Sequence, residues 1–253
     1  MDRCAEITVH ELVVSKSELL KAPDTERRFF ILLGHFGNEI VILNKIALAL
    51  DNFERTEDVE SKAYAVQSVF VAKLLIAKMF EGWDRLFQKL FFPSPLRLDY
   101  PPDLSEKARA ALDELGKFFA NSKHVATIRN EFTFHYPDQK LMDAIPNIPD
   151  DEEWKIYLSE TNGNSLYYVS EMIAGHALVS EIDPNKPIGL AKMIADRNRL
   201  TRNFLALIED CMNVFVKRHL NLRLSNDTEI KLKVPHSNDV RLPYFVAPPS
   251  KTA

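Results

Sequence analysis

The chain has 253 residues, of which 46% are hydrophobic and 27% charged, and its formal net charge is −4. This ordinary globular balance excludes a wholly disordered chain, and the slight acidity leaves nucleic-acid contact to a local patch rather than to overall charge. Seven glycines argue against a glycine-rich nucleotide-binding fold, and two cysteines exclude a disulfide scaffold and suit a reducing cytosol.

Residues 1–22 form an N-terminal extension, in which Ile7-Thr8-Val9 could be a short strand and residues 17–21 a helical turn. Pro23-Asp24 then marks the start of a long helix over 24–51, because apolar residues follow in steps of three and four. Residues 52–58 form a polar connection. A second long helix is predicted over 59–92, where Pro93 ends it.

After a proline-rich loop, Ser105 caps a third helix, and a shorter helix spans 122–135. Within an insert at 152–169, aromatic and β-branched runs flank Asn162-Gly163 and predict a β-hairpin. A helix over 170–182 and a last long helix over 188–219 follow. Residues 221–253 are a C-terminal tail with one strand-like run, 230–234, and a proline-rich end expected to be loose.

These elements predict an all-α fold, in which residues 23–220 form a helical bundle of long antiparallel helices with a small β-hairpin insert. No signal peptide is evident at the N-terminus. The most apolar window, 29–50, is interrupted by His35, Asn38 and Glu39, so no membrane span is expected. We therefore expect a cytoplasmic protein.

Motifs for cofactors and metals are missing. The sequence has no phosphate-binding glycine loop, no His-Glu-x-x-His, no Cys-x-x-Cys and no Gly-x-Ser-x-Gly. The seven histidines are scattered, and no two are three or four residues apart on a helix. We expect neither a cofactor nor a bound metal.

The segment from His124 to Pro137 is the strongest candidate for chemistry. Val125, Ile128, Phe132 and His135 fall on one helical stripe, which places His135 toward the core at the helix end, with Arg129 on the flank. Arg129 and His135 are about 9 Å apart along the axis and about 120° apart around it, so they could line one wall of a groove. Structural roles are the alternative: a core or capping histidine, and an arginine paired with a carboxylate of a neighbouring helix.

Arg129-Asn130 followed by His135 near a helix end resembles the motif of the HEPN superfamily, and Ile128 to Tyr136 is similar to abortive-infection-type bacterial relatives. The resemblance implies an all-α bundle, often dimeric, and in active members metal-independent RNA cleavage in phage defence or toxin–antitoxin systems. RNA, a second copy of the chain and an antitoxin protein are the partners it implies.

The residue types suit that chemistry. A histidine exchanges protons near neutral pH and could deprotonate a ribose 2′-hydroxyl, so His135 is the expected acid/base. The Arg129 fork would hold phosphate oxygens, and Asn130 would orient either a phosphate or the histidine by hydrogen bonding. The competing hypothesis is a non-catalytic helical module for protein–protein interaction or oligomerisation, which the negative net charge favours.

Two further residues are unusual for their positions. Arg197 falls on the apolar stripe of the last long helix, which indicates either a phosphate-facing arginine or, as we favour, a buried ion pair with an acid such as Glu81 or Asp84. Gly82 lies inside the second long helix, where glycine is unfavourable by about 1 kcal/mol relative to alanine. A close approach of two helices explains it best.

Overall fold

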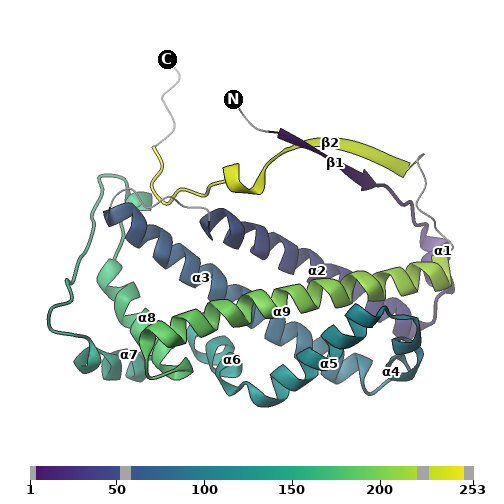
Figure 1. Ribbon diagram of the computed structural model, residues 1–253, viewed down its shortest axis with the longest axis horizontal. Helices are drawn as coiled ribbons and strands as arrows, with labels where there is room; N and C mark the ends of the chain where they lie inside the picture. The colour runs from purple at the N-terminus through teal and green to yellow at the C-terminus, as the bar shows by residue number, and fades with distance from the viewer. Residues whose placement is uncertain (1–3, 52–57, 221–227, 248–253) are drawn as a thin grey trace.

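The computed structural model describes residues 4–51, 58–220 and 228–247, which are mostly helical (Figure 1). The α-helices are α1 (Lys16–Lys21), α2 (Asp24–Asp51), α3 (Asp58–Gly82), α4 (Leu96–Asp99), α5 (Glu106–Asn121), α6 (Lys123–Thr127), α7 (Asp138–Ala144), α8 (Tyr168–Ile182) and α9 (Lys186–Phe215). Three π-helical segments continue α3, α6 and α9 respectively: η1 (Trp83–Phe91), η3 (Ile128–Thr133) and η6 (Val216–Leu220). Short 3₁₀ turns lie at η2 (Pro101–Asp103), η4 (Ile145–Asn147), η5 (Asn162–Asn164) and η8 (Ser237–Asp239).

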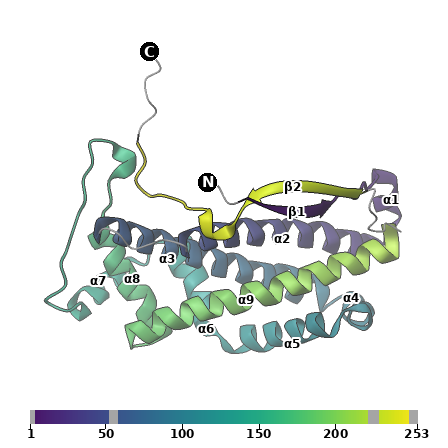
Figure 2. The ribbon, with the colours of Figure 1, turned by 45° about the horizontal axis from the view of Figure 1, so that its top comes forward.

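The predicted all-α fold is confirmed. Helix α2 packs against α3 and α9, α5 lies along α9, and α8 joins α9 at the end of the bundle where α7 lies (Figures 1 and 2). The long helices occupy the expected positions, and Ser105 caps α5 by accepting a hydrogen bond from the Ala108 amide at 3.2 Å. The connection predicted at 52–58 lies outside the described residues except for Asp58, which begins α3.

The core is rich in aromatic side chains contributed by α2, η1 and α9. The ring of Phe29 meets those of Phe87 and Tyr100 edge to face, and all three side chains are fully buried. At Gly82, α3 lies close against α2, because a Cβ atom there would lie 2.1 Å from the Phe36 ring. The close helix approach expected at Gly82 is confirmed.

The two strand-like runs pair with each other across almost the whole chain. β1 (Cys4–His10) and β2 (Glu229–Pro235) form an antiparallel ribbon in which Ile7 faces Leu232 and Val9 faces Ile230. The ribbon lies over α2, as Figure 2 shows. The sequence predicted both runs but not their pairing.

The expectation of a loose C-terminal end is wrong for part of the tail. Tyr244 donates its hydroxyl hydrogen to the Ser165 carbonyl at 2.8 Å, and the Asn164 side chain exchanges two hydrogen bonds with the Val246 backbone, at 2.7 and 2.9 Å. These bonds fasten the tail to the 152–169 insert. The insert itself has a single antiparallel bridge, Tyr157–Leu166, because its long loop leaves few backbone groups in register.

Two helical stretches have the length and apolar composition of a membrane span: Asp24–Asp51 and Asp58–Phe91. Core helices of globular proteins meet the same criterion, and here both contribute buried side chains such as Leu33, Ile40 and Leu75 to the bundle. The expected absence of a membrane span therefore stays a prediction.

Candidate functional site at the Arg129 motif

The motif segment begins as a regular helix and then widens. Val125 and Ile128 are fully buried and Phe132 nearly so, as the predicted stripe requires. From Ile128 to Thr133 the backbone is π-helical, and the Thr133 hydroxyl donates to the Ile128 carbonyl at 2.9 Å. Single π-helical turns occur frequently at functional sites, because they reposition side chains that a regular helix would place elsewhere.

Arg129 is half-buried and held on two sides. Its Nη2 atom donates to a carboxylate oxygen of Glu81 on α3 at 2.8 Å, and its Nη1 atom donates to the Asn130 side-chain oxygen at 2.8 Å. The Nε atom is buried and has no hydrogen-bond partner among the described residues. Each terminal nitrogen carries a further N–H. The guanidinium is thus fixed in orientation while keeping donors for an additional acceptor.

Glu81 is shared between two arginines. Its carboxylate also accepts a hydrogen bond from Arg85 Nε at 3.0 Å, one helical turn further along the chain. Burial raises the pKa of Glu81, but the hydrogen bonds and charges of Arg85 and Arg129 outweigh it, so the net pKa is below the usual value. The carboxylate is therefore ionised at neutral pH and offsets part of the charge of Arg129.

His135 is placed differently from the expectation. The sequence predicted a core-facing position, but the residue is exposed and makes no hydrogen bond or ion pair with any other described residue. The widened turn shifts the helical register, and the helix ends at Thr133, so His135 lies beyond it. The structure thus brings Arg129 and Asn130 into contact and leaves the imidazole of His135 open to solvent.

A second histidine, which the sequence did not single out, fastens the motif segment to α9. His124 Nε2 lies 3.0 Å from an Asp196 carboxylate oxygen, and both side chains are nearly buried. Asp196 also accepts a hydrogen bond from Arg199 at 3.1 Å, and Arg199 lies over the Phe118 ring. No sequence signal could have paired residues 72 positions apart. The role of this cluster is to position α6, and with it the Arg129 turn.

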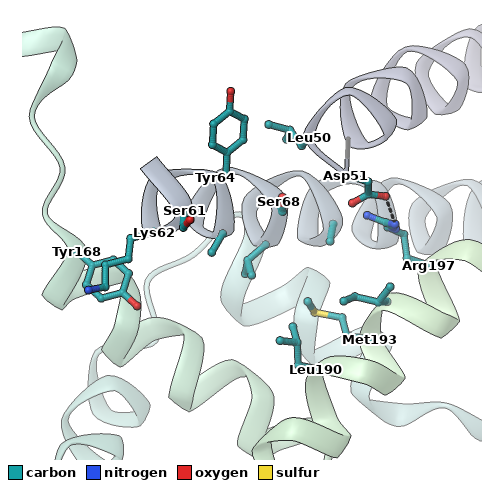
Figure 3. Close-up of a pocket in the computed structure, with 14 residues that line it drawn as sticks. Leu50, Asp51, Ser61, Lys62, Tyr64, Ser68, Tyr168, Leu190, Met193 and Arg197 are labelled. Carbon is teal, nitrogen blue, oxygen red and sulfur yellow. Dashed lines mark hydrogen bonds and ion pairs between the residues drawn. The ribbon is translucent and has the colours of Figure 1, made fainter. Parts of the chain in front are cut away.

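Arg197 has a different partner from the one expected. Arg197 is buried and ion-paired, as predicted, but the carboxylate belongs to Asp51 at the end of α2, at 2.8 Å, and not to Glu81 or Asp84. The Asp51 side chain itself is 43% exposed. The pair forms one wall of a cavity of about 450 Å³ between α3, α8 and α9 (Figure 3). Helix α2 brings Asp51 next to α9, whereas Glu81 is taken by Arg129. This cavity does not include the Arg129 motif.

Among the described residues, no group of three or more His, Cys, Asp or Glu side chains is arranged to hold a metal ion. Comparisons with protein-family models, curated proteins and solved structures find no match. The chemistry of this chain is therefore argued from its own geometry.

Proposed function

We propose that the surface formed by Arg129, Asn130 and His135 cleaves RNA without a metal ion, as the resemblance to HEPN proteins implies. The observation that supports this best is the contrast within the motif. Arg129 is oriented by Glu81 and Asn130, whereas His135 is exposed and bonded to no described residue. A fixed cation and an accessible imidazole are the two kinds of group that phosphodiester transfer requires.

In the proposed reaction the ribose 2′-oxygen attacks the adjacent phosphorus while an imidazole of His135 takes the hydroxyl proton. The bond between phosphorus and the 5′-oxygen breaks, and a protonated imidazole gives that oxygen a proton. The products are a 2′,3′-cyclic phosphate and a 5′-hydroxyl. The remaining N–H groups of Arg129, which are not bonded to Glu81 or Asn130, bind the phosphate oxygens. Asn130 orients these oxygens. A homodimer would supply a second imidazole, so that base and acid are separate groups.

The test is incubation of the full chain with total RNA in excess EDTA, comparing wild type with His135→Ala. Cleavage by wild type and its loss in the variant are expected. His35→Ala is the matched control, because His35 is also exposed and lies on α2. Cleavage that His135→Ala and His35→Ala leave equally intact would refute the assignment.

A second candidate, an oligomerisation module, is favoured by the β1–β2 ribbon. A two-stranded ribbon is marginally stable alone in water. Its apolar cross-strand pairs, Ile7 with Leu232 and Val9 with Ile230, are each more than 40% exposed. A second copy covering these pairs would stabilise the ribbon. Sedimentation of wild type against Ile230→Lys tests this, and a strict monomer for both at tens of micromolar protein would exclude it.

A further inference from the structure

A second cavity, of about 460 Å³, lies between α3, α8 and the beginning of α9. Its volume is within the range of small-molecule sites, which are mostly apolar with a few convergent polar groups. The apolar part of its wall comes from Val66, Val69, Met172, Leu178, Val179 and Leu190. Its wall is thus mostly aliphatic.

Three nitrogen-bearing side chains line the same cavity: Lys73, His176 and Lys186. Lys186 Nζ contacts His176 Nδ1 and donates to the Asn147 carbonyl at 3.0 Å. Burial and the neighbouring charge of Lys186 lower the pKa of His176, so the imidazole is neutral and accepts from the ammonium. Lys186 is therefore a cation that is hydrogen-bonded but not charge-compensated.

Lys73 has fewer polar partners than Lys186. Lys73 is half-buried, its ammonium makes no hydrogen bond with any described residue, and its Nζ atom lies 5.9 Å from the centroid of the Phe70 ring. Burial lowers its pKa, partly offset by the charge of Glu171. In the described part of the chain no carboxylate oxygen lies within 4 Å of the Nζ atom of either lysine.

Glu152 and Glu171 also line the cavity, so their negative charges have to be compared with the positive charges of the two lysines. Both are exposed residues, so water screens their carboxylates more strongly than it screens the half-buried ammonium groups. The interior of the cavity is consequently more positive than a count of charges indicates. An anion that entered it would gain the ion pair that Lys73 lacks.

We propose that this cavity binds an organic monocarboxylate with an aliphatic tail, its carboxylate on Lys73 and its tail along the wall of α3 and α8. The neighbouring 450 Å³ cavity shows by comparison why the carboxylate is assigned to this one. There the buried cation, Arg197, already has the Asp51 carboxylate at 2.8 Å, so an incoming anion would find no unpaired charge. Lys186 adds a second positive charge, and its hydrogen bond to His176 holds it in place.

The test uses octanoate as the probe and 1-octanol as the control, measured by titration calorimetry on the full chain. One saturable octanoate site is expected, with 1-octanol bound at least about tenfold more weakly, because the alcohol cannot form a charge-assisted pair with Lys73. Lys73→Met should weaken octanoate about tenfold or more, and Lys186→Met should weaken it less. Equal binding of acid and alcohol would overturn the proposal.

Gly175 offers a matched pair of variants that does not depend on charge. It lies on the cavity wall in α8, and a Cβ atom there would meet nothing within 4 Å. Gly175→Ala should keep octanoate binding, whereas Gly175→Leu should fill the cavity and abolish it. Circular dichroism checks that both variants are folded. No saturable binding by wild type at millimolar octanoate, or unchanged binding by both Lys73→Met and Gly175→Leu, would show that the cavity is not a carboxylate site.

Discussion

Arg129 and Lys73 are both half-buried cations, but only Arg129 has a carboxylate at ion-pair distance among the described residues. Arg129 lies 2.8 Å from the Glu81 carboxylate, whereas no carboxylate oxygen of the described residues lies within 4 Å of Lys73. Helix α3 serves both, since it carries Lys73 and the Glu81 partner of Arg129. The two cations are therefore suited to different ligands. Arg129 has a fixed orientation and shares its charge, which suits a transient phosphate, while Lys73 has an unpaired charge, which suits a bound ligand.

The largest expected effect comes from breaking the Arg129 site itself. Arg129→Ala should lower the RNA cleavage rate by about 10²–10³-fold, because it removes a donor aimed at developing charge. Arg129→Lys should not restore the rate, since lysine keeps the charge but loses the fork. Arg85→Ala is the matched control, because Arg85 bonds the same carboxylate and is largely exposed. Equal losses of cleavage rate in Arg85→Ala and Arg129→Ala would contradict a specific role for Arg129. Rates come from gel quantification.

Gly82→Ala should displace α3 from α2. It should therefore disturb the surroundings of both Arg129 and Lys73. The added Cβ atom would lie 2.1 Å from the buried Phe36 ring, which has little space to move. Overpacking of this kind destabilises by about 1–3 kcal/mol, and we expect the upper part of that range. Urea denaturation measures it, and a free energy of unfolding equal to wild type would contradict the close helix contact.

Gly175→Ala should stabilise the protein, by less than Gly82→Ala destabilises it. Its added methyl group meets no atom within 4 Å, so the variant gains helix propensity without a clash. We expect the free energy of unfolding to rise by about 0.5–1 kcal/mol. The same urea experiment compares the two glycines directly, and a destabilised Gly175→Ala would show that the cavity wall has no room.

The smallest effect is the pH dependence contributed by Glu81. Its pKa in the folded protein is lowered from the ordinary 4.5, so the unfolded state binds more protons and the carboxylate's stabilising contribution is lost as the pH falls through the acidic range. Glu81 is about one-third exposed, so the contribution should be below about 1 kcal/mol after screening. Glu81→Gln should show a flatter decline in urea midpoint between neutral pH and about pH 3. A decline as steep as that of wild type would mean that Glu81 contributes nothing.

Much of the fold could be predicted because local sequence patterns specify its helices and strands. The bounds of α2 follow from Asp24 and the apolar steps after it, and the strands β1 and β2 follow from their β-branched runs. Their pairing could not be predicted, because strand propensity does not specify a partner more than 200 residues away. The ion pair of Arg197 was predictable from its apolar stripe, but its partner Asp51 was not, since long-range packing decides it.

The candidate site was predictable only in part. The contact of Arg129 with Asn130 follows from their adjacency, and an acid for Arg129 from a neighbouring helix was among the alternatives. The exposure of His135 was not predictable, because a π-helical turn shifts every later residue off the regular stripe. The lysines of the second cavity lie more than 100 residues apart, on α3 and α9, and neither carries a motif.

The proposed cleavage mechanism is best checked by the chemistry of the RNA ends that wild-type protein leaves in excess EDTA. A motif built on Arg129 and His135 predicts 2′,3′-cyclic phosphate ends, no cutting of DNA of the same sequence, and loss of these ends in both Arg129→Ala and His135→Ala. Ends bearing a 5′-phosphate and a 3′-hydroxyl, or cyclic phosphates produced equally by folded Arg129→Ala and His135→Ala, would contradict it.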